Sequence, residues 1–289
     1  MRYTETTKTL EEEPMNVCTV HRVSAFTHDS KGGNEAGVVL DASKYSAAQM
    51  AQIAKTIGYS ETAFILSIDK DRIEVRYFTP KSEVPLCGHA TIGLLNLLRF
   101  KGLVQAGTMR LKTPAGVFPV KIGPSVATLL FPEPVILKTI EPSSVSKPLA
   151  LRQSDLANLP VATVDAGVKE LYIGLENRNL LRSLNPDDHT LETLSEAHGV
   201  SGVVFYTKNV SPALAEVRNF LPAIGIREES ATGTAAAALS KLLTTYDAPF
   251  EEGIIEQGET LGKPSRIHVK YDTLAATIEI SGKFRVIDT

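Results

Sequence analysis

Two stretches of this chain read almost alike, and they decide its fold. VRYFTP at residues 75–80 is followed by CGHAT at residues 87–91, and in the second half VRNFLP at residues 217–222 is followed by ATGTA at residues 231–235. Each joins a strand-like Arg-x-Phe-x-Pro run to a glycine that opens an alanine- or leucine-rich stretch with helical spacing. Such an internal repeat predicts two similar domains, each directing one helix N-terminus toward a shared point.

The meeting of two helix N-termini has a chemical consequence. The first turn of a helix carries unpaired backbone N–H groups and a partial positive charge. Two such ends at one cleft make a binding site for a small anion. We therefore expect the partner of this chain to be a small anionic metabolite.

Strand-like segments flank one apolar helix in each half of the sequence. The first helix is expected over residues 91–100 and the second from Gly233 to about Leu243, and both have a broad apolar face. This order predicts an α+β fold of two pseudo-repeated domains, each a β-sheet wrapped around a central helix.

The limits of these domains follow from composition. A polar segment at residues 1–14 is expected to be an N-terminal extension, and the proline-rich stretch at residues 132–148 is the expected domain boundary. We place the first domain at residues 15–135 plus about 277–289, and the second at residues 136–276.

The composition excludes several classes of function. Hydrophobic residues make up 43% of the 289 residues and charged residues 22%, the balance of a soluble globular protein. A net charge of −3 gives no basis for nucleic-acid binding. No apolar run approaches the roughly 20 residues that span a bilayer, and the N-terminal segment lacks the apolar core of a signal peptide. We expect a cytoplasmic protein that binds neither nucleic acid nor membrane.

Glu61 is the first candidate for chemistry. It follows a helix expected over residues 47–57 and ended by Gly58, and the apolar run at residues 63–66 lies directly behind it. A carboxylate held against apolar surface loses solvation, so we expect its pKa to rise toward the working pH. Such a group can remove a proton from carbon and return it elsewhere. Alternatively, Glu61 is a helix cap or a surface residue at a strand end.

His89 opens the first apolar helix. Gly88 before it allows close approach of the backbone, and the imidazole could hold a ligand carboxylate or orient Glu61. Alternatively, His89 only caps the helix.

In the second motif, Glu228 and Glu229 precede Thr232-Gly233-Thr234. The helix dipole favours an acid at this place for structural reasons alone, which explains one of the two. We expect one acid to accept a hydrogen bond from an amine or hydroxyl of the ligand, and Thr234 to donate one to its carboxylate.

The sequence does not indicate a disulfide framework or a metal site. Cys18 and Cys87 are the only cysteines, too few for a disulfide framework, and no Cys/His cluster has the spacing of a zinc site. We expect a metal-independent protein, because no cluster of suitable ligands is visible.

Taken together, these residues resemble the PhzF-like family of the diaminopimelate epimerase fold. That family has Gly-Asn-Pro-x-Ala, Ser-Glu-Thr-Ala-Phe, Arg-x-Phe-Thr-Pro with Cys-Gly-His-Ala-Thr, Glu-Asp-Pro-Ala-Thr-Gly-Ser-Ala, and a late Gln-Gly with Gly-Arg-Pro-Ser. The corresponding segments stand here in the same order at residues 33–37, 60–64, 76–91, 228–235 and 257–265. The resemblance covers nearly the whole chain after Met15.

The resemblance implies roles for particular residues. Glu61 matches the acid/base glutamate and His89 the site histidine of the family. Around the ligand it implies Asn34, Gly88, Glu229, Gly233 and Thr234. Phenazine-pathway members isomerise trans-2,3-dihydro-3-hydroxyanthranilate, and their glutamate carries a proton between ring carbons without a cofactor. The family also implies a homodimer.

This chain departs from the family pattern beside the second helix. Glu229 stands where the family has aspartate, Ser230 where it has proline, and Thr234 where it has serine; Lys263 replaces the late arginine. The longer side chain of Glu229 moves its carboxylate by roughly an ångström, enough to change which ligand fits.

We therefore expect a cofactor-independent isomerase acting on a small amino- or hydroxy-carboxylate. One alternative is an amino-acid racemase or epimerase. Related enzymes of this fold use two facing cysteines, but the second motif here has Thr232-Gly233, and a hydroxyl is too weak an acid to replace a thiol. The other alternative is a non-catalytic protein that binds a small metabolite.

Overall fold

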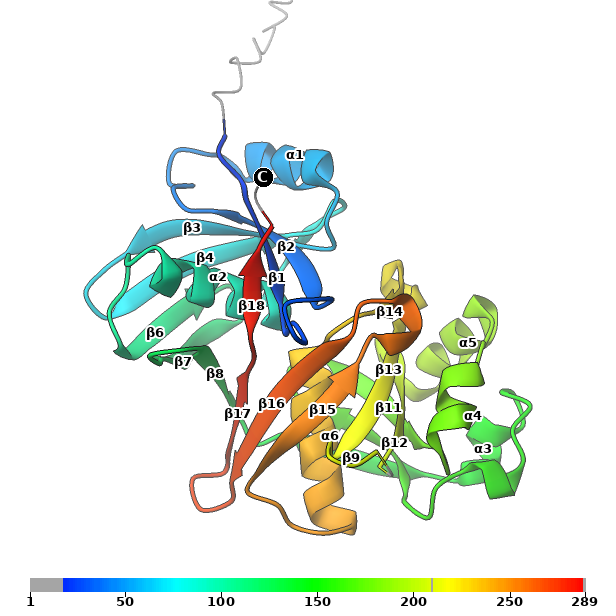
Figure 1. Ribbon diagram of the computed structural model, residues 1–289. Helices are drawn as coiled ribbons and strands as arrows, with labels where there is room; N and C mark the ends of the chain where they lie inside the picture. Colours follow the sequence, from blue (N-terminus) through cyan, green and yellow to red (C-terminus); the bar gives the residue numbers. More distant parts are fainter. Residues whose placement is uncertain (1–17, 209, 288–289) are drawn as a thin grey trace, which may run out of the picture.

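The computed structural model describes residues 18–208 and 210–287, and the extension expected at residues 1–14 lies outside them (Figure 1). The strands of the first half are β1 (His21–Ala25), β2 (Asn34–Val39), β3 (Thr62–Ile68), β4 (Arg72–Phe78), β5 (Glu83–Val84), β6 (Gly107–Thr113), β7 (Gly116–Ile122) and β8 (Ala127–Pro132). Those that follow are β9 (Val135–Ile140), β10 (Val161–Asp165), β11 (Lys169–Gly174), β12 (Gly202–Thr207), β13 (Ala215–Leu221), β14 (Ile226–Glu229), β15 (Glu252–Gln257), β16 (Ser265–Asp272), β17 (Thr277–Ser281) and β18 (Phe284–Val286). The helices are α1 (Ala47–Ile57), α2 (Gly88–Phe100), α3 (Pro142–Ser146), α4 (Arg178–Ser183), α5 (Asp188–His198) and α6 (Gly233–Tyr246).

The strands of the two halves pair in the same order. β1 is antiparallel to β2, which is parallel to β3; β3 is antiparallel to β4, which is parallel to β6; and β7 and β8 follow antiparallel. The order recurs in β10, β11, β12, β13, β15, β16 and β17. Parallel neighbours need a crossover connection, which places helices between them in the chain.

Two of these crossovers, α2 and α6, form the centres of the two halves. Every residue of α2 from His89 to Leu98 is buried, as is every residue of α6 from Gly233 to Ser240. Because helices without a polar face belong in a core, strands enclose both: β1, β2, β8 and β18 contact α2, and β9, β10, β16 and β17 contact α6. The mixed, sheet-dominated fold is confirmed. The division into two pseudo-repeated domains stays a prediction, which the shared order of pairing supports.

The remaining helices cover the outer faces of the sheet (Figure 1). On α1, Met50 and Ile53 pack against Phe64 and Phe78. The predicted bounds of this helix are confirmed: Ser46 caps its N-terminus, and Gly58 ends it in the left-handed conformation at φ 75°. α4 and α5 pack on the opposite half through a separate apolar cluster.

The last two strands of the chain join the two halves. β17 pairs with β16 of the second half and β8 of the first, and β18 pairs with β1. The proline-rich residues 132–148, expected as the domain boundary, hold β9 and α3. Within residues 18–208 and 210–287, no helix is both long and apolar enough to cross a membrane.

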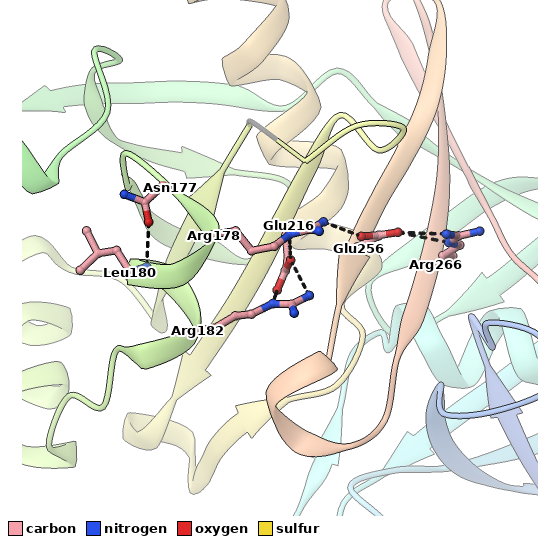
Figure 2. A network of polar contacts seen from close by, with 7 residues as sticks. All are labelled: Asn177, Arg178, Leu180, Arg182, Glu216, Glu256 and Arg266. Atoms are coloured by element: carbon pink, nitrogen blue, oxygen red, sulfur yellow. Dashed lines mark hydrogen bonds and ion pairs between the residues drawn. The ribbon is translucent and has the colours of Figure 1, made fainter.

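A series of arginine–glutamate ion pairs joins α4 to the sheet (Figure 2). The buried Glu216 carboxylate forms ion pairs with two arginines of α4. Arg178 Nε lies 2.7 Å from Glu216 Oε2, and Arg182 Nε lies 2.8 Å from Glu216 Oε1. Arg178 and Arg266 then hold Glu256, each at 3.1 Å. These pairs join α4 to β13, β15 and β16, and so fix the outer side of the sheet that carries the second motif.

Candidate active site

The N-termini of α2 and α6 abut at the centre of the molecule. A Cβ added to Gly88 would lie 3.7 Å from Gly233 Cα and 3.9 Å from Thr234 N. Neither N-cap residue, Cys87 or Thr232, makes a side-chain capping bond. Two uncapped first turns therefore lie side by side, which is the arrangement that the internal repeat predicts.

Glu61 and His89 are brought together beside these helix ends. Glu61 precedes β3 and is buried, and its Oε2 lies 3.2 Å from His89 Nε2. Geometrically this is an ion-pair contact without a directed hydrogen bond, and within the described part of the chain Glu61 Oε2 has no hydrogen-bond partner. The histidine lies within the first turn of α2, one residue past Gly88. Glu61 is thus neither a helix cap nor a surface residue, and His89 is not the N-cap.

The direction of the pKa shift of Glu61 corrects the sequence expectation. Burial favours the protonated acid, but the neighbouring His89 outweighs it, and the pKa of Glu61 is lowered. The apolar run behind Glu61 indicated only the first effect. Glu61 is therefore a carboxylate at neutral pH and can act as a base.

Cys87 and His89 also lie close to each other. Cys87 Sγ is 3.5 Å from His89 Nδ1 and 3.8 Å from Nε2. Burial raises the pKa of the Cys87 thiol to about 11, so the thiol is protonated at neutral pH. Burial also disfavours the imidazolium, but the contacts with Cys87 and Glu61 outweigh it and raise the pKa of His89 well above its ordinary value. Since the thiol is uncharged, the Glu61 carboxylate is the charge that favours the imidazolium.

Asn34 connects the first motif to the second. It begins β2, directly after Gly33 at φ 82°. Its Nδ2 donates to Glu229 Oε2 and to the Ala231 carbonyl, and lies 3.1 Å from His89 Nδ1. Burial raises the pKa of Glu229, against the opposing charge of His89. One amide thus holds groups from both halves of the chain around the imidazole.

The structure distinguishes between the two acids of the second motif. Glu228 is held by Arg218 through two contacts of 2.8 Å, so it has a structural partner. Glu229 points to Asn34 and the site. Thr234 is buried in the first turn of α6, and its hydroxyl makes no hydrogen bond among the described residues. Glu229 and Thr234 thus lie beside the helix ends, and their roles toward a ligand stay predictions.

Two polar residues of the site region were missed as contributors. Gln257 accepts from Thr232 N at 3.0 Å and donates to the Glu229 carbonyl at 2.8 Å, so it fixes the entry to α6. The sequence indicates a turn near the site at Gln257-Gly258 without giving Gln257 a contact, and the segment forms the hairpin between β15 and β16.

The second residue is Glu170, which is fully buried on β11. Its carboxylate accepts from Asn219 at 2.8 Å and from Tyr172 at 3.0 Å, and burial raises its pKa to about 7. Asn219 also donates to Thr232 Oγ1 at 3.2 Å. Glu170 could have been found from the sequence as an acidic residue within an otherwise apolar strand.

The sequence predicted no cluster of side chains able to bind a metal ion, and this prediction is wrong. One donor atom from each of Glu61, Cys87 and His89 lies within 4.8 Å of the others, among the described residues, and all three are buried. Spacing along the chain could not reveal this, because Glu61 comes from a separate strand. That the reaction needs no metal stays a prediction.

Two surface hollows, of about 430 and 200 Å³, lie away from Glu61: the first over β15 to β17, the second beside Glu216 and Gln257. Neither is lined by Glu61, His89 or Glu229. Glu61, His89 and Glu229 are each less than a tenth exposed.

Known proteins similar to this chain are named as isomerases. An uncharacterized isomerase of Deinococcus radiodurans is 32% identical over 271 residues, 89% of this chain and 88% of the relative. Trans-2,3-dihydro-3-hydroxyanthranilate isomerase of Pseudomonas aeruginosa is 27% identical over 273 residues, 90% and 94% of the two chains. The chain belongs to the family described as Phenazine biosynthesis-like protein, whose profile matches residues 23–287. A crystal structure from that family, of a Bacillus anthracis protein, superposes with a TM-score of 0.84 at 27% identity, covering 95% of this chain and 98% of the other.

Proposed function

We propose that this protein is a cofactor-independent isomerase that moves a proton through Glu61 on a small amino- or hydroxy-carboxylate. The observation that carries the proposal is the buried Glu61 carboxylate, whose Oε2 faces His89 without a hydrogen bond of its own beside two uncapped helix N-termini. The helix ends supply N–H donors for the ligand carboxylate. Asn34, Gly88, Glu229, Gly233 and Thr234 complete the ligand site.

The reaction balances without a co-reactant. Glu61 takes a proton from one carbon of the ligand, the electron pair shifts along the conjugated system, and the carboxylic acid returns the proton to a second carbon. His89 provides the charge that offsets the Glu61 carboxylate before the transfer. The burial of Glu61 and His89 keeps water away from the transferred proton.

Two-thiol racemisation is disfavoured by the contacts of the second motif. Thr232 occupies the place of the second cysteine, and its hydroxyl accepts from Asn219 and Gln257, each at 3.2 Å. On the other side, the Cys87 thiol stays protonated at neutral pH because burial raises its pKa to about 11. No pair of thiol and thiolate faces the ligand.

The test uses solvent hydrogen exchange. Anionic metabolites, with trans-2,3-dihydro-3-hydroxyanthranilate among them, are screened for thermal stabilisation, and hits are incubated with the protein in D₂O. We expect deuterium to enter the ligand, and Glu61→Gln to slow this at least about 100-fold. The control is Glu83→Gln, the same change at an acid paired with Arg76 outside the site.

Wild-type rates in Glu61→Gln would refute the role of Glu61. Tight binding of a metabolite with no exchange in wild-type protein would instead identify a non-catalytic binding protein. A homodimer and a cytoplasmic location remain predictions; sedimentation tests the first.

A further inference from the structure

The side chains of Glu61, Cys87 and His89 combine a carboxylate oxygen, a thiol sulfur and an imidazole nitrogen in one buried cluster. These three donor types are those of protein zinc sites. All three residues are less than a tenth exposed, so their positions are fixed by packing against α2 and β3.

The spacing of the donors fits a tetrahedral cation. With Zn–N and Zn–O of about 2.0 Å and Zn–S of about 2.3 Å, tetrahedral geometry separates N from O by about 3.3 Å and N from S by about 3.5 Å. In the structure His89 Nε2 is 3.2 Å from Glu61 Oε2 and 3.8 Å from Cys87 Sγ. The third separation, between a Glu61 carboxylate oxygen and Cys87 Sγ, is within 4.8 Å.

Two further features complete the fit. Glu61 Oε2 has no hydrogen-bond partner among the described residues, so a cation would not have to displace one. The ring of His89 is also positioned by Asn34, whose Nδ2 lies 3.1 Å from His89 Nδ1 and donates to Glu229 and to the Ala231 carbonyl. This is the kind of support that orients metal-ligating histidines.

We propose that Glu61, Cys87 and His89 bind Zn²⁺, or a similar thiophilic divalent cation, and that the bound cation inhibits the protein. Coordination releases two protons to solvent: the thiol proton, because the thiolate is the ligand, and the proton on His89 Nε2, because only the neutral imidazole can bind the cation. Three protein ligands leave a fourth position for water or for the carboxylate of a ligand. The inhibitory consequence rests on the proposed function, because the cation occupies the carboxylate that would move the proton.

The binding test uses Cd²⁺ and Co²⁺ alone and does not depend on activity. We expect one equivalent of Cd²⁺ to produce an ultraviolet sulfur-to-metal charge-transfer band, and Co²⁺ to give the intense visible bands of a tetrahedral site. Cys87→Ser removes the Cd²⁺ band and weakens binding about 100-fold or more, measured by competition with a chromophoric chelator. Cys18→Ser is the matched control, since Cys18 is the only other cysteine, and it keeps the band. Glu61→Gln keeps the band at saturation but binds about 10-fold more weakly or worse.

Several results would overturn the site. They are the absence of a band at one equivalent of Cd²⁺, an equal band in Cys87→Ser, or a weak octahedral Co²⁺ spectrum in the wild-type protein. If Cys87→Ser does not fold, Cys87→Ala is read in the same way, and the Co²⁺ spectrum of the wild type decides by itself.

Inhibition is tested separately on ligand deuteration. Zn²⁺ is expected to stop the exchange and a chelator to restore it. Full exchange at Zn²⁺ saturation would refute inhibition. If exchange instead survives Glu61→Gln while Cd²⁺ still binds through Cys87, the proposed role of Glu61 fails and the metal site stands.

Discussion

Gly88 and Gly233 lie at the facing ends of α2 and α6, so close that a Cβ on Gly88 would reach 3.7 Å from Gly233 Cα. That distance is ordinary van der Waals contact. A methyl group therefore fits between the helices, but it fills the space in front of their first-turn N–H groups.

We predict that Gly88→Ala folds normally and loses ligand binding. The free energy of unfolding should change by less than about 1 kcal/mol, because alanine favours the helix and meets no clash. Stabilisation by an anionic metabolite should disappear in thermal melts. Gly93→Ala, in the same helix, is the contrast: its Cβ would lie 2.7 Å from Val23 Cγ2, so overpacking should cost about 1–3 kcal/mol. Ligand stabilisation retained by Gly88→Ala would contradict the helix-end site.

Asn34→Ala should destabilise the protein by about 1–3 kcal/mol, because it leaves the buried Glu229 carboxylate without its amide donor. Ser230→Ala breaks a different bond between the same segments, from Ser230 Oγ to the Gly33 carbonyl at 3.0 Å, and should cost about 1 kcal/mol or less. Urea unfolding measures both. An equal loss of stability in Ser230→Ala and Asn34→Ala would contradict the larger contribution assigned to the Asn34 side-chain amide.

Glu170 should make stability fall as pH rises. Its pKa is about 7 in the folded protein, above the ordinary value of 4.5. Its contribution is therefore complete below about pH 4.5 and is lost as pH rises to about 7, by about 3 kcal/mol in all. Glu170→Gln should remove that part of the pH dependence, measured by urea unfolding at several pH values. Burial is the main cause of the raised pKa of Glu170, and the charge of Glu229, which remains in both proteins, adds to it. An unchanged pH profile would show that Glu170 is not a buried acid.

The two copies of the Arg-x-Phe motif make the same contacts at different depths. Arg76 stacks on Phe78 and pairs with Glu83, and Arg218 stacks on Phe220 and pairs with Glu228. In the first pair the side chains are 28% and 33% exposed, and in the second 9% and 7%.

Since breaking a buried pair leaves an uncompensated charge, Arg218→Ala should cost about 3 kcal/mol or more. Arg76→Ala should cost about 1 kcal/mol, and the loss of stacking is common to both. Chemical denaturation compares them. Equal losses would mean that burial does not set the strength of this contact.

Much of the fold could be predicted because local signals and packing agree. Periodicity located α1, α2 and α6, and Gly58 marked the end of α1. Local pattern alone could not choose between Glu228 and Glu229, because alternation in a strand shows that neighbours point apart but not which one faces the site. Only the family resemblance indicated Glu229. The pKa of Glu61 was misjudged for a related reason: it depends on His89, whose distance is set by tertiary packing. Tertiary packing also brings Cys87 close to Glu61, so the sequence alone could not show this contact.

The pairing of β18 with β1, and of β17 with β8, has a consequence for synthesis on the ribosome. The sheet that surrounds α2 cannot close until residues 284–286 have emerged, although most of its strands are made first. Throughout translation of the second half, β1 and β8 expose unsatisfied edges. The nascent first half is thus the part of this protein most in need of a chaperone.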